Sequence, residues 1–277
     1  MGAGRDTVLR KVRFALLTLA LAASPGTSQA LAERLFAGYE IEWQGLPIGV
    51  FETELVTEAE GYRVLYEART TGLLGWLFPF VSQGSSEGTW TAAEVRSQSY
   101  QVGSRRRDDS SAWAVRFGAD GRAIEVELPE EDRLDREPVP PALQVAPDPL
   151  GLALGAIGAA APAVRFTGTS FDGKRALRFE LACADDLVPL ADAPPGAAAA
   201  ADTEALACTV DGELIAGASR RWQGRTMRDD DRGPASVWFG RGIVGDGFWP
   251  VRVEAPTRYG TVTVRLVRLE PAADATN

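Results

Sequence analysis

The sequence predicts a mainly β fold, in which antiparallel strands form a curled sheet, a half-barrel or an open barrel, with one short helix. Apolar and polar residues alternate in many short segments, which is typical of strands with one face buried. Turn signals that contain glycine and aspartate separate these segments at short intervals, as in antiparallel sandwiches and barrels. One apolar segment led by a proline interrupts the pattern and supplies the helix.

The alternation is clearest near the two ends of the chain. Apolar residues alternate with glutamates over 39–43, and with Thr263 and Arg265 over 262–266. Turn signals such as Asp172-Gly173 and Asp211-Gly212 separate other segments of the same kind. Further strands are predicted at 48–57, 61–70, 85–92, 95–105, 111–118, 122–128, 164–171, 174–182, 213–219, 235–240 and 249–255.

The helix is predicted over 149–159. Asp148 followed by Pro149 is a favourable pair for the N-cap and the first helical position. The leucines and the isoleucine that follow supply an apolar face, whereas three interspersed glycines weaken the helix. The proline-rich segment before it, 137–149, is predicted to be extended.

The first 32 residues have the composition of a signal peptide. A basic start is followed by an apolar run over 14–23, a Ser-Pro-Gly break and the small residues before a cut after Ala32. The run is about half of the ~20 residues that a transmembrane helix needs, which disfavours a membrane anchor. We therefore expect 1–32 to be a signal peptide, with a cut after Ala30 as the alternative, and 33–277 to be a single β-rich domain in the periplasm.

The two cysteines, Cys183 and Cys208, lie in strand-like runs on either side of a segment rich in proline and alanine. In an oxidising compartment such a pair favours a disulfide between neighbouring strands, and two buried thiols are the alternative. Zinc usually takes four ligands, and the chain contains no histidine. No metal site is therefore predicted.

Composition excludes several classes of function. The formal net charge is −9 and becomes more negative once the basic leader is removed, which argues against nucleic-acid binding. Without histidine, the Ser-His-Asp and Cys-His catalytic arrangements are excluded. The glycine-bearing strings 240–242 and 245–247 lack the context of a phosphate-binding loop, and no cofactor is predicted.

Carboxylates are the remaining candidates for acid-base chemistry. Glu52 and Glu54 share one strand face, as do Glu125 and Glu127, and such acids usually form a solvated surface. The three aspartates at 229–231 could bind a cation, but they lack the ligand spacing of an EF-hand loop and favour a solvated turn. No catalytic residue is assigned.

An apolar run at 72–81 connects two predicted strands where a polar loop is expected. It predicts a lip over an apolar cavity or a contact with lipid, and a segment that folds back into the core is the alternative. Arginines cluster at 105–107 and within 220–228, each cluster followed by aspartates, which favours surface ion pairs over binding of an anionic head group. The predicted ligand-binding residues are Trp43, Leu74, Trp76, Phe78, Phe80, Trp90 and Trp113.

Several segments, taken in their order along the chain, resemble a known family. They are Tyr39 to Gly49, Thr70-Thr71-Gly72-Leu73, Asp148-Pro149-Leu150, Phe171-Asp172-Gly173-Lys174-Arg175, Cys208-Thr209-Val210, Ile215-Ala216-Gly217, Val237-Trp238-Phe239, Pro250 to Val253 and Tyr259-Gly260. Over about residues 37–269 the chain is similar to the bacterial secreted family catalogued as domain of unknown function 3108. The resemblance implies an envelope protein with a mostly antiparallel, curled sheet, and it supplies no catalytic residues. The region 185–205 is longer and richer in alanine than the family pattern.

Three functions are compatible with the sequence. The first is a non-enzymatic periplasmic binding or envelope-assembly protein for a lipid, a lipid-linked glycan or a polypeptide, with peripheral contact to the membrane. Its apolar run would cover a groove lined by strand aromatics. The second is an enzyme that acts on envelope polysaccharide through two carboxyl groups facing each other across a cleft. The third is a structural module that binds envelope proteins through its sheet edges or arginine patches. We expect the first.

Overall fold

The described strands of the chain form one antiparallel sheet of thirteen, in the order β7-β6-β5-β4-β3-β2-β1-β13-β12-β11-β10-β9-β8. The computed structural model describes residues 33–58, 61–91, 94–189, 204–222, 233–241 and 247–271. The predicted leader, the aspartates at 229–231 and two of the four arginines of the second cluster, Arg225 and Arg228, lie outside these residues. All described residues belong to one compact unit, Leu31–Asn277.

The first half of the chain is a meander of seven strands. Its strands are β1 (Glu33–Trp43), β2 (Leu46–Glu58), β3 (Gly61–Thr70), β4 (Phe80–Trp90), β5 (Val95–Arg106), β6 (Asp109–Phe117) and β7 (Ala123–Glu127). The short helix α1 (Gly72–Leu77) connects β3 to β4.

The second half is a meander of six strands that joins the first through the pairing of β13 with β1. Its strands are β8 (Arg165–Phe171), β9 (Ala176–Pro189), β10 (Glu204–Ala216), β11 (Ala235–Arg241), β12 (Phe248–Thr257) and β13 (Gly260–Pro271). Between the halves lie α2 (Glu130–Asp135), the 3-10 turn η1 (Pro141–Leu143) and α3 (Pro149–Ala159), and the 3-10 turn η2 (Arg220–Trp222) follows β10.

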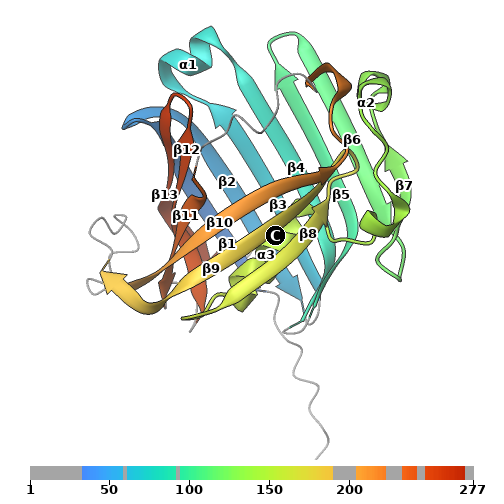
Figure 1. Cartoon of the computed structure of the whole chain (residues 1–277). Coiled ribbons are helices and arrows are strands. Elements are labelled where there is room, and N and C mark those ends of the chain that lie inside the picture. The colour runs from blue at the N-terminus through green and yellow to red at the C-terminus, as the bar shows by residue number, and fades with distance from the viewer. Residues whose placement is uncertain are drawn as a thin grey trace, which may run out of the picture. The chain divides into compact units, whose positions relative to one another are not determined.

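The sheet curls but does not close. Figure 1 shows β8, β9 and β10 passing across the face of the first meander, and α3 contacts β4, β5, β8 and β12 from within the curl. The two ends of the strand order, β7 and β8, are not paired with each other. The predicted mainly β fold with an open, curled antiparallel sheet is therefore confirmed.

The alternating pattern places one face of each strand in the interior. Buried residues of β1, β2, β3, β12 and β13 form one core cluster with Leu154 of α3, and Leu181, Leu206 and Phe239 form another with Ala160. A third cluster, around Tyr100, Val115 and Phe171, joins β5 and β6 to the end of β8. The core thus depends on contacts between the two meanders as well as on strand pairing.

The structure corrects two details of the predicted elements. Asp211 and Gly212 do not form a turn: they lie within β10 and pair with Glu180 and Phe179 of β9. The Phe179 ring packs across from Gly212, and this cross-strand contact fills the space that a glycine leaves in a strand. The one-turn helices α1 and α2 were not anticipated, because neither has the length or the periodicity that predicts a helix.

On the side where β7 and β8 are not paired, side-chain contacts join the two halves of the sheet. We call the residues that make them, Trp113, Asp132, Arg136, Asp172 and Lys174, the closing cluster. The turn between β8 and β9 reaches β6, where the Trp113 Nε1–H donates to the Asp172 carbonyl over 3.0 Å. The buried Lys174 Nζ lies 3.4 Å from the centre of the Trp113 ring and 2.6 Å from Asp132 Oδ2. Arg136 donates to Asp132 over 3.2 Å and to the carbonyl of Gly217 over 3.0 Å.

The turn can approach β6 this closely because residue 173 is glycine. Gly173 has φ of +88°, and a Cβ atom there would lie 2.7 Å from Val115 Cγ2. The Asp172 carboxylate fixes the turn by accepting from the backbone N–H groups of Lys174 and Arg175, over 2.8 and 2.6 Å. Burial alone would raise the pKa of Asp132, but the hydrogen bond and charge of Lys174, together with Arg136, hold it below its ordinary value.

The disulfide prediction is confirmed. Cys183 and Cys208 face each other in the register of β9 and β10, with Cα atoms 3.9 Å apart and a bond between their sulfur atoms. The bond joins neighbouring strands, as the strand-like runs around both residues indicated. No helix in the described part of the chain is long and apolar enough to cross a membrane.

The double replacement Cys183→Ala with Cys208→Ala is expected to lower the free energy of unfolding by about 3 kcal/mol. The reason is that the bond restricts the unfolded chain across a sequence separation of 25 residues. Urea denaturation without reductant measures the difference. Dithiothreitol should bring the wild type to the stability of the variant and leave the variant unchanged; equal stabilities without reductant would contradict the prediction.

The replacement Lys174→Met is expected to lower the free energy of unfolding by about 2–3 kcal/mol, because it leaves the partly buried Asp132 without its ammonium partner. Arg178→Met, in the strand β9 that follows the turn, is the matched control. The Arg178 ion pair with Glu213 is exposed, so its loss should cost less than about 1 kcal/mol.

The effect of Lys174→Met should also depend on pH. A carboxyl group whose pKa is lowered on folding stabilises the protein above its unfolded pKa, about 3.9 for aspartate, and this contribution disappears as the pH falls through the folded pKa. Urea denaturation at several pH values should therefore show the two proteins converging below about pH 4. A difference that is constant with pH would contradict the role given to the ion pair.

Candidate functional site

Asp148 anchors helix α3 inside the curled sheet. Its fully buried carboxylate accepts from the backbone N–H groups of Leu150 and Gly151, over 2.9 and 3.1 Å, which confirms the predicted N-cap. The second carboxylate oxygen accepts from the hydroxyls of Ser86, over 2.7 Å, and of Ser97. The start of α3 is thereby tied to β4 and β5.

Tyr62 of β3 completes this buried polar group. Its hydroxyl lies 3.0 Å from Ser86 Oγ, and burial, together with the nearby charge of Asp148, raises its pKa to about 12. Burial likewise raises the pKa of Asp148 above its ordinary value, although four hydrogen bonds oppose that shift. Every oxygen of the group has a partner, so its role is to position α3.

Small residues on α3 allow close contact with the sheet at one position and leave space at others. At Gly151 the contact is so close that a Cβ atom would lie 2.7 Å from the Tyr62 hydroxyl. One cavity, of about 230 Å³, lies between α3 and β1, β2, β12 and β13; its wall includes Phe51, Leu55, Ile157 and Trp249. The hydroxyl of Tyr39, in the same wall, donates to the Pro250 carbonyl and accepts from Trp249 Nε1, each over 3.0 Å. The cavity therefore presents an apolar lining.

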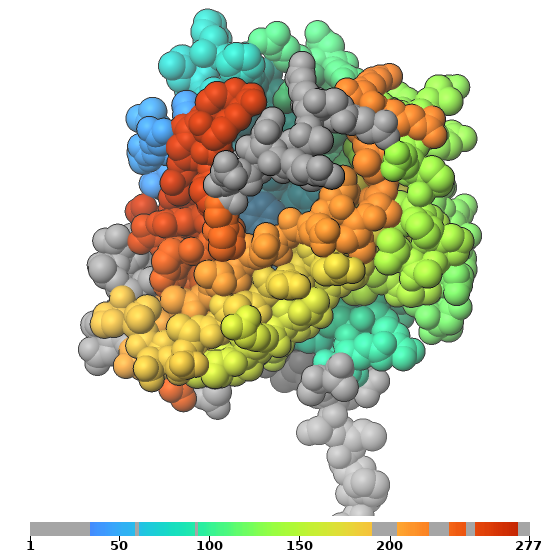
Figure 2. Space-filling view, viewed as in Figure 1, coloured from blue at the N-terminus to red at the C-terminus, as the bar shows by residue number. Residues whose placement is uncertain are grey.

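Two more cavities continue along the helix. One of about 180 Å³ shares Leu55, Ile157 and Trp249 with the first, and also contacts Trp90. One of about 400 Å³ shares Trp90 with the second and lies between the glycines of α3 and Phe166 of β8. Figure 2 shows the molecule hollowed between β10 and the red strands β12 and β13, with blue residues of the first strands at the bottom. The interior of the curl is thus incompletely filled on several sides of α3.

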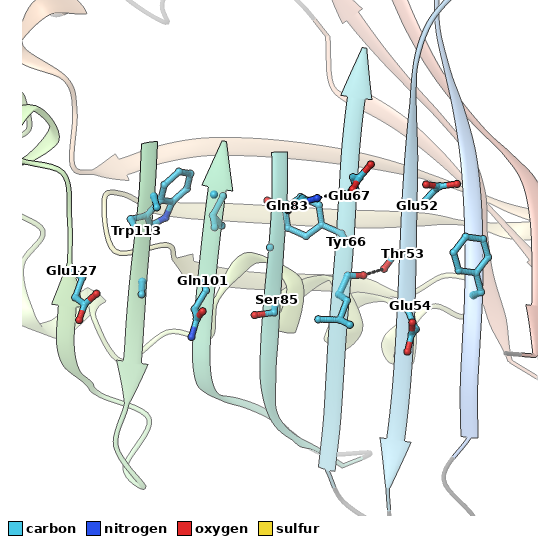
Figure 3. Close-up of a pocket in the computed structure, with 17 residues that line it drawn as sticks. Glu52, Thr53, Glu54, Tyr66, Glu67, Gln83, Ser85, Gln101, Trp113 and Glu127 are labelled. Atoms are coloured by element: carbon cyan, nitrogen blue, oxygen red, sulfur yellow. Dashed lines mark hydrogen bonds between the residues drawn. The ribbon is translucent and has the colours of Figure 1, made fainter. Parts of the chain in front are cut away.

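A larger and shallower groove, of about 690 Å³, lies over β1 to β7. Figure 3 shows Glu52, Glu54, Glu67 and Glu127 around it. Three of these glutamates are ion-paired: Arg69 lies 3.0 Å from both Glu52 and Glu67, and Arg34 lies 2.6 Å from Glu54. The hydrogen bonds from Gln83 and Arg69 lower the pKa of Glu67.

Glu67 of this groove does not have the electrostatic environment of a general acid. A general acid that works near neutral pH needs a raised pKa, and Glu67 has the opposite shift. The carboxyl group with a raised pKa among the described residues is Asp148, which is buried and saturated with hydrogen bonds. Among the described residues, no cluster of three His, Cys, Asp or Glu side chains could hold a metal ion.

The structure separates the seven predicted ligand-binding residues. Leu74, Trp76, Phe78 and Phe80 lie in and just after α1, whose helical residues include none that is buried. Trp43 lies at the end of β1 and donates to the Tyr259 carbonyl. The apolar run up to Pro79 is therefore on the surface and does not fold back into the core, and α1 lines none of the cavities described above.

The other two predicted residues lie elsewhere. Trp90 ends β4, at the opposite end of that strand from α1, and lines two of the cavities beside α3. Trp113 belongs to the closing cluster and also borders the groove in Figure 3. Trp43, Trp90 and Trp113 thus do not line a single groove, because the strands that carry them place them at different ends and positions of the sheet.

The residues beside α3 that the sequence analysis missed are Tyr39, Phe51, Ala153 and Trp249. The sequence indicated the space that these residues line only indirectly, through the glycines of the predicted helix. The glycines of the predicted helix were interpreted as weakening it, whereas in the structure they and the alanines create the space between α3 and the sheet.

Asp148→Ala is expected to lower the free energy of unfolding by about 3 kcal/mol or more, because it leaves buried N–H and hydroxyl donors without an acceptor. Asp148→Asn is the matched control. It keeps an oxygen that can cap the helix, and the hydroxyls of Ser86 and Ser97 can turn to accept from its amide, so it should cost clearly less. Urea denaturation of the three proteins tests the order; equal losses would contradict the capping role.

Comparison with curated proteins finds no match to the chain. Among solved structures, the chain is similar to a crystal structure described as a beta-barrel-like protein of domain of unknown function DUF1849 from Brucella abortus, with a TM-score of 0.46 and 12% sequence identity. That alignment covers 86% of this chain and 97% of the other. The model of the family described as protein of unknown function (DUF3108) matches residues 38–191, more than half of the chain. The chain therefore belongs to the DUF3108 family.

Proposed function

We propose that the protein is a non-enzymatic binding protein of the cell envelope, which holds one apolar chain, such as the acyl chain of a lipid, beside α3. The observation that carries the proposal is the series of cavities along this helix, whose walls are mainly aromatic and aliphatic. Apolar pockets with few polar groups are typical of sites for hydrophobic small molecules.

The sizes of the cavities favour a narrow ligand. Ligand pockets commonly measure about 300–1,000 Å³, and two of the three cavities are smaller than that. Their shared lining residues, Trp90 and Trp249 among them, connect them in a series around α3, from the face that carries Leu154 to the face that carries the glycines. A single hydrocarbon chain suits such a series better than a compact ligand or a folded polypeptide.

The rigid position of α3 supports binding over catalysis. The helix start is fixed by Asp148 and by strands on both sides of the curl, so the walls of the cavities are preorganised. Three of the four glutamates of the outer groove are ion-paired, and the groove lies on another face of the sheet. The proposed location, the periplasm, rests on the signal-peptide composition of residues 1–32.

Binding can be tested with cis-parinaric acid, a fatty acid whose fluorescence rises in an apolar site. The wild type should bind it, and Ala153→Phe should weaken binding at least about tenfold, because the new ring would occupy the cavity beside α3. Ala112→Phe is the matched control, since Ala112 is an exposed alanine that lines the outer groove. Thermal unfolding should confirm that both variants fold.

Two outcomes would contradict the proposal. One is a wild type that, after extraction of any co-purified lipid, does not raise the fluorescence of the probe. The other is an equal loss in both variants, or a loss in Ala112→Phe alone, which would move the binding site to the outer groove.

A further inference from the structure

The exposed aromatic side chains of the protein are gathered at one end of the sheet. We call Trp43, Leu46, Leu73, Trp76, Phe78 and Tyr259 the aromatic rim. Leu73 and Trp76 are 72% and 78% exposed, and Phe78 is 59% exposed. Among the side chains that the structure describes, every aromatic one that is strongly exposed belongs to this rim. A random scatter of surface aromatics would not give that distribution.

The topology explains why these residues lie together. The β1–β2 turn, α1 between β3 and β4, and the β12–β13 turn all leave the sheet at the same end, because the strands between them are antiparallel neighbours. Direct hydrogen bonds join the three: the Gln44 side chain donates to the Tyr259 carbonyl over 2.6 Å, and the Thr71 N–H donates to the Ile48 carbonyl over 3.1 Å. Strand pairing and these hydrogen bonds therefore fix the positions of the three segments that carry the rim.

Arginines lie among the rim aromatics. The Arg107 guanidinium is 5.8 Å from the centre of the Phe78 ring and donates to the Leu77 carbonyl over 2.7 Å. The Arg258 guanidinium is 4.5 Å from the centre of the Tyr259 ring. Arg105 and Arg106 are exposed at the end of β5, next to the strand that leaves α1.

The charge at this end of the sheet is locally basic. Within the described part of the chain, Arg105, Arg106, Arg107 and Arg258 form no ion pair with an acidic side chain, so the predicted surface pairing of 105–107 with the aspartates that follow is not formed. Asp108 and Asp109 close the same turn and offset part of the positive charge. Because the whole chain carries a formal net charge of −9, a negatively charged surface would be attracted here while most of the protein is repelled.

From this arrangement we propose that the aromatic rim docks on a lipid bilayer that contains anionic phospholipids. Tryptophan and tyrosine favour the boundary between head groups and acyl chains, and arginine extends its aliphatic stem along apolar groups while its head contacts phosphate. The rim offers apolar side chains on separate turns. A fluid, planar surface can receive these together, whereas a protein partner would need a matching pocket for each. The rim lies apart from the cavities beside α3, and this proposal does not depend on the ligand proposed for them.

Flotation with vesicles tests the proposal, using phosphatidylcholine alone and phosphatidylcholine mixed with phosphatidylglycerol. The wild type, without residues 1–32, should float with the mixed vesicles and much less with the neutral ones. Leu73→Asp with Trp76→Asp should reduce flotation at least about tenfold. Ile124→Asp with Val188→Asp is the matched control, because these residues are 61% and 37% exposed but lie in β7 and β9, at the end of the sheet opposite to the rim.

The outcomes separate this proposal from the proposed function. Ala153→Phe should float like the wild type, and the rim variant should still bind cis-parinaric acid. Failure of the wild type to float with mixed vesicles would overturn the docking proposal and leave acyl binding intact. Equal flotation of the rim variant and the control variant would overturn it as well, since the contact would then not involve the rim.

Discussion

A sheet whose first and last strands are not paired must be held in its curl by contacts other than backbone hydrogen bonds. In this protein the closing cluster supplies them, and the ammonium group of Lys174 is its centre. Lys174 lies on the turn between β8 and β9 of the second meander, Trp113 lies in β6 of the first, and Asp132 lies in α2 between them, so the contact spans the two halves of the chain. The cost of burying a charge is offset by the aspartate and by the face of the indole ring.

Because side chains and not strand pairing join the two ends of the sheet, the diameter of the curl is not set by the number of strands. A closed barrel of fixed strand number has a set diameter, whereas an open sheet can adjust its curl to whatever lies inside. Here the interior holds α3, whose glycines and alanines allow close contact at Gly151 and leave cavities elsewhere. Asp148 ties the start of this helix to the sheet, so the cavities keep their shape. Helix α3 also packs against β8, and this contact helps to protect an unpaired edge strand.

The local features of the fold could be predicted from the sequence. Alternation revealed the strands, Asp148-Pro149 marked the start of α3, and the two cysteines indicated a bond between neighbouring strands. The contacts between distant segments could not be predicted. Asp172-Gly173 was recognised as a turn, and Phe171 to Arg175 as part of a family pattern, but nothing local shows that this turn reaches Trp113. The cavities were missed for the same reason. A glycine shows that the helix lacks a side chain at that position, but whether a neighbouring side chain fills the space depends on the tertiary packing.

The aromatic rim and the cavities beside α3 are linked by the geometry of β2. Leu46 of the rim and Phe51 of the cavity wall are five residues apart on this strand, which corresponds to roughly 17 Å at ~3.3 Å per residue. The hydrocarbon core of a bilayer is about 30 Å thick, so one acyl chain spans about 15 Å. A lipid whose head group lies among the rim arginines would therefore carry the end of its chain to about the depth of Phe51. The two proposals are thus compatible in scale, although each depends on different residues.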